Sequence, residues 1–230
     1  MNLLECIDGA RNLINEPLAS SRTFPDNTSS FFTDSILMNY HNLIQQEVQQ
    51  EVVQADEDYF VTQAFLSVVA NTAEYTLPAT FIKARRVEDV RNAASPVEIF
   101  PVTINQRGHV SYDGFRTGSQ GALGGAYYLR GNQIILTDTP TFTNASAIRL
   151  HFITRLTDVT AATTSSDLPA EHHRVLIWGI VKLALFQQQS DTTLADREYE
   201  KHMARMRQEI ESRQTQRVRR VAAAITSRGD

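Results

Sequence analysis

The chain has 230 residues, of which 42% are apolar, and a net charge of −4 at neutral pH. This length suits one large domain, or one domain with a docking arm. A single cysteine, Cys6, excludes an internal disulfide and a cysteine-based zinc cluster. No apolar run approaches the roughly 18 residues of a membrane span, and no basic segment typical of a signal peptide is evident. We therefore expect synthesis and assembly in a cytoplasm.

Helical periodicity predicts two helices at each end of the chain. The second helix begins at a cap formed by Thr33 or Asp34. The third is apolar almost all round over residues 175–186, which indicates a central helix with Trp178 largely buried. The predicted helices cover 3–15, 34–54, 170–189 and 194–210.

The middle of the chain, residues 59–155, has the composition of strands separated by turns. Gly131-Asn132 predicts a two-residue hairpin, and residues 105–125 are expected to form a long loop. Because the strands cluster between pairs of helices, we predict an α+β fold rather than a doubly wound one. The expected strands are 60–69, 74–77, 81–90, 97–100, 127–130, 133–137 and 148–153.

No motif of a known catalytic site is found in the sequence. The segment 118–125, G-S-Q-G-A-L-G-G, either cradles a phosphate or is a flexible loop, and the strand that follows favours the loop. His172 and His173 lie about 100° apart on a helix, cannot easily share a metal, and are interpreted as surface residues. The acidic run 56–58 either binds a divalent ion or is the solvated end of a helix. We predict no catalytic activity, no cofactor and no metal.

The second helix carries a face rich in glutamine. An uncharged polar face of this kind is either solvated or packed against a neighbouring subunit without burial of charge. The candidate inter-subunit residues are Gln45, Gln46, Gln49 and Gln50.

Charge is distributed unevenly along the chain. Residues 1–60 contain ten acidic side chains and two arginines, whereas residues 205–230 contain seven arginines and three acidic side chains. On a helical projection of 213–225, apolar side chains fall on one side and arginines on the other. This segment binds in a groove of a partner protein, binds along the phosphate backbone of a nucleic acid, or is a basic tail in solution. The candidate docking residues are Arg213, Arg217, Val218, Arg220, Val221 and Ile225.

Four short motifs, in this order, resemble those of tailed-bacteriophage head-to-tail connector (adaptor) proteins. Residues 31–40 (F-F-T-D-S-I-L-M-N-Y) resemble the opening of a helix in that family, and residues 75–81 (Y-T-L-P-A-T-F) its Y-x-L-P-x-x-F motif. Residues 127–140 (Y-Y-L-R-G-N-Q-I-I-L-T-D-T-P) resemble its hairpin, and residues 167–176 (D-L-P-A-E-H-H-R-V-L) the entry to its apolar helix.

The resemblance implies a structural protein of the virion neck, between capsid portal and tail. It implies a homo-oligomeric ring, usually twelve-fold, that docks on the portal protein, receives a downstream neck or tail protein and leaves a channel for genomic DNA. The expected architecture is a helical bundle with an inserted antiparallel β-rich part, which together form a body over 1–210, and an extended C-terminal helical arm over 211–230. The alternatives are a nucleic-acid-binding module that uses the arginine-rich helix, and a small hydrolase with an unrecognised site. The acidic body and the scattered aromatic residues argue against the first of these.

Overall fold

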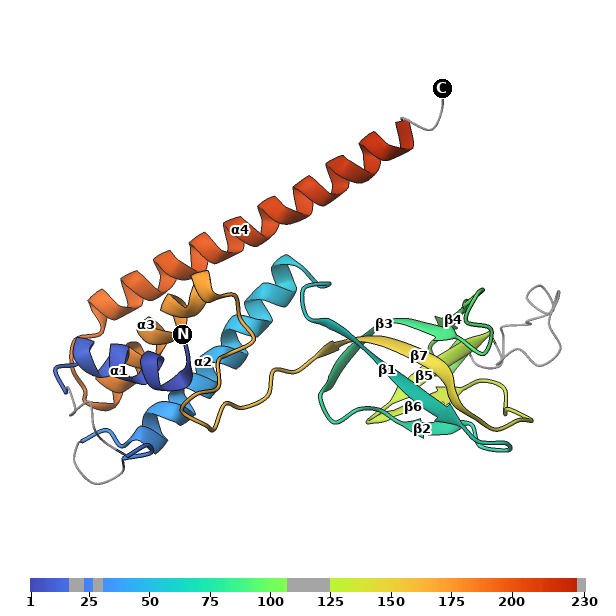
Figure 1. Cartoon of the computed structure of the whole chain (residues 1–230), viewed down its shortest axis with the longest axis horizontal. Helices are drawn as coiled ribbons and strands as arrows, with labels where there is room; N and C mark the ends of the chain where they lie inside the picture. The colour runs from blue at the N-terminus through green and yellow to red at the C-terminus, as the bar shows by residue number, and fades with distance from the viewer. Residues whose placement is uncertain (17–22, 27–30, 107–124, 227–230) are drawn as a thin grey trace. The chain divides into compact units, whose positions relative to one another are not determined.

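A computed structural model describes residues 1–16, 23–26, 31–106 and 125–226, with side chains up to Arg213. The chain forms two compact units: the first comprises Met1–Tyr59 and Leu156–Asp230, and the second Phe60–Arg155. The first is helical and the second is a sheet (Figure 1), so the predicted α+β class is confirmed. No helix in the described part of the chain is both long and apolar enough to cross a membrane.

The helices of the first unit begin and end at recognisable caps. The Asn2 side chain accepts a hydrogen bond from the backbone of Glu5, whose carboxylate accepts one from the Asn2 backbone, and this capping box starts the first helix. That helix ends earlier than predicted because Asn15 adopts a left-handed conformation, with φ of 59°. The fourth helix continues without a break through residue 210, the predicted end. The helices are α1 (Leu3–Leu13), α2 (Asp34–Ala55), α3 (His173–Gln187), preceded by the 3-10 turn Ala170–His172, and α4 (Thr193–Thr226).

Helix α3 lies at the centre of the helical unit and packs against α1, α2 and α4. The prediction of a central α3 is therefore confirmed, but one of its details is wrong. Phe186 is 75% exposed at the C-terminal end of the helix, although the apolar run predicted burial over 175–186. Trp178 packs against the core of the unit. The side chains at the core of this unit include Leu3, Ile7, Ala10, Phe32, Leu37, Ile44, Val48, Ile180, Val181, Ala184, Tyr199, Met206 and Ile210.

Gly179 of α3 packs closely against Ile44 of α2. A Cβ atom at this position would lie 2.6 Å from Cγ2 of Ile44, which is itself buried. We expect Gly179→Ala to lower the free energy of unfolding by about 1–2 kcal/mol, because overpacking outweighs the gain in helix propensity. Urea denaturation followed by the fluorescence of Trp178 measures this change.

Gly9→Ala is the matched control for this substitution. A Cβ atom at Gly9 would lie 3.1 Å from Cδ1 of Ile177, the mobile end of a partly buried side chain. Its cost should therefore be clearly smaller than that of Gly179→Ala. Equal effects at the two glycines would show that the contact with Ile44 is not a tight constraint.

The second unit is one seven-stranded sheet with the order β1-β7-β3-β4-β5-β6-β2. Strands β1 and β2 are joined by only five residues yet lie at opposite edges in this order. Because five residues span at most about 17 Å, the sheet must curl so that its two edges approach each other. The strands are β1 (Val61–Val68), β2 (Glu74–Thr76), β3 (Phe81–Asp89), β4 (Val97–Pro101), β5 (Ala126–Arg130), β6 (Gln133–Leu136) and β7 (Asn144–Thr154).

The prediction of an antiparallel β-rich part is wrong for one pair of strands, since β4 and β5 run parallel. The chain between them is long enough for the crossover that a parallel pair requires. The predicted hairpin at Gly131 is confirmed: Arg130 pairs with Gln133, and Gly131 has a positive φ of 56°. The last strand is longer than predicted because it pairs with β1 on one side and β3 on the other.

Candidate functional site

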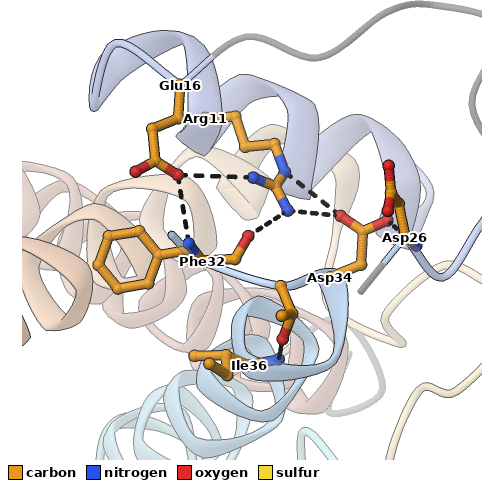
Figure 2. Close-up of polar contacts among 7 residues, drawn as sticks. Arg11, Glu16, Asp26, Phe32, Asp34 and Ile36 are labelled. Atoms are coloured by element: carbon orange, nitrogen blue, oxygen red, sulfur yellow. Dashed lines mark hydrogen bonds and ion pairs between the residues drawn. The ribbon is translucent and has the colours of Figure 1, made fainter. Parts of the chain in front are cut away.

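A buried ion pair joins α1 to the start of α2 (Figure 2). The Arg11 guanidinium donates to Oδ1 of Asp34 at 2.8 Å and to the Phe32 carbonyl at 2.6 Å, and its side chain is 1% exposed. The second oxygen of Asp34 accepts a hydrogen bond from the backbone N–H of Asp26 at 2.8 Å. Glu16 accepts one from the Phe32 N–H and lies 3.7 Å from the guanidinium. The network compensates the charge of both buried groups.

This network explains the first adaptor-like motif. Phe32 is fully buried in the core of the helical unit, while Phe31 is 64% exposed. The hydroxyl of Thr33 accepts from the Ile36 N–H and caps α2, and Asp34 provides the carboxylate for Arg11. Each of the three residues after Phe31 therefore has a structural task in positioning α2.

Two other motifs also position the backbone. In the second, the buried Tyr75 hydroxyl donates a hydrogen bond to the Thr72 carbonyl across the turn between β1 and β2. In the fourth, Nε2–H of His173 donates to the Leu168 carbonyl at 2.8 Å and fastens the entry to α3. These residues carry the resemblance to the adaptor family through the scaffold rather than through an exposed surface.

The glutamine-rich face of α2 binds a segment of its own chain. The side-chain N–H of Gln45 donates to the Thr157 carbonyl at 3.0 Å, and Oε1 of Gln49 accepts from the Leu156 N–H at 3.1 Å. Both glutamines are buried, so a solvated or inter-subunit position is wrong for these two. Gln46, which is half-buried, bonds Asp158 at 3.1 Å, and Gln50 is exposed. Of the four candidate residues, only these last two keep the proposed role.

The histidine pair is buried, which corrects its interpretation as surface. His172 is 5% exposed and His173 is 3% exposed, and burial lowers the pKa of both imidazoles. His172 Nε2 has no hydrogen-bond partner and lies 3.6 Å from a carboxylate oxygen of Glu209 on α4. The neighbouring Glu171 is 48% exposed and bonds Arg213 at 3.0 Å. Its pKa is lowered, first by its own backbone N–H and then by Arg213.

The other candidate loops contribute little to a site. Asp56 is buried at the end of α2, where its side chain accepts a hydrogen bond from the Asp58 backbone, so it closes the helix rather than lying in solvent. The glycine-rich segment 118–125 lies outside the described residues except for Gly125, whose carbonyl accepts from the Phe100 N–H.

The candidate docking residues belong to the last part of α4. The last buried side chain described on this helix is Ile210, and Glu211, Ser212 and Arg213 are exposed. Arg213 bonds Glu171 of the same unit. The backbone of α4 continues to Thr226, whereas the side chains of the other candidates lie outside the described set: Arg217, Val218, Arg220, Val221 and Ile225.

In the described part of the chain, these polar clusters join elements of the fold to one another. The family model described as "SU10 adaptor protein" matches residues 1–228. The chain therefore belongs to the SU10 adaptor protein family, a phage head-to-tail adaptor family. No curated protein matches the chain. The family is a structural one rather than an enzyme family, and it implies a virion component that interacts with portal and tail proteins.

Proposed function

We propose that the protein forms a ring that docks on the portal in the neck of the virion and leaves a channel for DNA. The family match over nearly the whole chain carries this proposal. The body, residues 1–210, would combine a helical bundle with the β-rich part. A ring needs heterologous contacts that close by rotation, usually twelve-fold in the resembled proteins. Gln46 and Gln50 on α2 are candidates for these contacts.

The C-terminal segment 211–230 is the proposed portal-docking arm. Three observations support it: α4 continues for sixteen residues after Ile210, the first three side chains after Ile210 are exposed, and the sequence beyond alternates arginines with an apolar face. An apolar stripe on a helix fits a hydrophobic groove. Val218, Val221 and Ile225 would bind that groove, while the arginines would meet acidic portal side chains.

We expect deletion of residues 214–230 to abolish docking on the portal while the body stays folded. The cut leaves Ile210 and the bond between Arg213 and Glu171 in place. Electron microscopy of purified portal mixed with each protein measures docking: rings should form on the portal with the full chain and be missing with the truncated one. Circular dichroism checks the body.

Two double variants separate the contribution of the apolar side chains of the arm from that of its arginines. Val218→Asp with Val221→Asp should shorten the lifetime of the complex, whereas Arg217→Gln with Arg220→Gln should reduce its dependence on salt. Full docking of the truncated protein would show that the body is the anchor. A strong, salt-dependent affinity of the full chain for duplex DNA, lost with the same arginines, would instead favour the nucleic-acid-binding alternative.

A further inference from the structure

The junction of α3 and α4 brings an imidazole and two carboxylates together. Glu171 and His172 lie in the turn before α3, and Glu209 lies on α4. One ligand atom from each of the three lies within 4.8 Å of the other two. Glu209 follows His172 by 37 positions in the sequence, so only the packing of α4 against the start of α3 forms the group.

The state of His172 points to a ligand. Its side chain is 95% buried and its Nε2 atom has no hydrogen-bond partner, although that atom faces Glu209 at 3.6 Å. A buried polar atom without a partner is costly in a folded protein. In a tetrahedral zinc site with bonds of about 2.0–2.2 Å, neighbouring ligand atoms lie roughly 3.3–3.6 Å apart. The separation between His172 and Glu209 already has this value.

We propose that Glu171, His172 and Glu209 form a site for a divalent transition metal, with Zn²⁺ as the ion whose ligand preference fits. One imidazole and two carboxylates are ligands that zinc accepts in proteins. A cavity of about 110 Å³, lined by Glu171 and His172 among others, leaves space for a water as the fourth ligand. The proposal replaces the sequence-based expectation of no metal, and it does not depend on the proposed docking function.

Two arginines compete with the ion for the carboxylates. Arg213 bonds Glu171 at 3.0 Å, and Arg205 bonds Glu209 at 3.1 Å. Glu171 and Arg213 are both about half exposed, so their pair can separate at little cost. The ion must displace these guanidinium groups, and removal of one of them should strengthen metal binding. Substitution of an arginine and substitution of a ligand should therefore change the zinc affinity in opposite directions.

The test uses the untagged full chain after treatment with a chelator. Equilibrium dialysis against Zn²⁺, followed by elemental analysis, should find one zinc per chain. At a zinc concentration 100-fold above the dissociation constant, the melting temperature followed by Trp178 fluorescence should rise by roughly 5 °C or more. Glu171→Gln, Glu209→Gln and His172→Gln should each reduce zinc affinity by tenfold or more, and Arg213→Gln should increase it several-fold.

His151→Gln, which changes a histidine of β7 in the other unit, is the matched control and should leave zinc binding unchanged. Neither carboxylate is buried, so glutamine at Glu171 or Glu209 should not unfold the protein, and these variants remain informative if His172→Gln is unstable. The proposal is overturned if no zinc binds at 100 µM free ion. It is equally overturned if zinc binds with the same affinity to the wild type and to both glutamate variants, because the ion would then be held elsewhere.

Discussion

Asp34→Ala is expected to lower the free energy of unfolding of the helical unit by about 3–5 kcal/mol. The substitution leaves the guanidinium of Arg11 buried beside the carbonyl of Phe32, with Glu16 at 3.7 Å as a distant partner. It also removes the acceptor for the Asp26 N–H. A buried charge that loses its partner cannot recover its hydration, and this explains the large effect. Urea denaturation followed by Trp178, the single tryptophan of the chain, measures the unfolding of this unit.

Two variants control for this interpretation. Arg11→Met combined with Asp34→Leu replaces the pair by apolar residues and should recover much of the loss, because no buried charge remains. Lys201→Ala removes an ion pair with Glu198 on the surface of α4, where the lysine is 65% exposed, and should cost about 0–1 kcal/mol. A double variant as unstable as Asp34→Ala would mean that the shape of the pair, rather than its charge, is what matters.

The free energy of unfolding is expected to fall as the pH drops below about 6.5. Burial lowers the pKa of His41, His172 and His173 from the ordinary value of 6.5, although the neighbouring Glu209 and Glu171 oppose this at His172. At a pH between the lowered pKa of a histidine in the folded protein and its ordinary pKa of 6.5 in the unfolded chain, the unfolded chain binds more protons than the folded one. Acid therefore favours unfolding. Each histidine contributes a slope of up to about 1.4 kcal/mol per pH unit, or about 4 kcal/mol for the three.

Urea titrations of Trp178 fluorescence at half-unit steps from pH 7.5 to 5.0, with a chelator present, measure this slope. His41→Gln should reduce this slope by up to a third. Burial raises the pKa of Glu88, but Arg149 and Arg86 outweigh it and hold the pKa below 4.5. The stability that the Glu88 carboxylate contributes is therefore lost only below pH 4.5, which is outside the range of these titrations. Stability that stays constant between pH 6.5 and 5.0 would refute the burial of neutral histidines.

Local sequence signals determined the elements and the family. The apolar periodicity of the helices, the cap at Thr33 and the Gly131-Asn132 turn depend on neighbours a few residues away, so the sequence alone predicts them. The order of helices, strands and helices likewise indicated the α+β class. The adaptor-like motifs were recognisable because their residues have fixed local tasks, as the hydrogen bonds of Tyr75 and His173 show.

Only the tertiary structure decided which polar side chains are buried and with what partners. Gln45 and Gln49 have the pattern of a solvated face, yet they satisfy the backbone of residues 156 and 157, more than a hundred positions away. Arg11 meets Asp34, and His172 meets Glu209, through the packing of different helices. Helical spacing places a residue on a face of its own helix but carries no information about what covers that face. A buried backbone group needs a partner wherever the chain brings one, and that requirement is set by the fold as a whole.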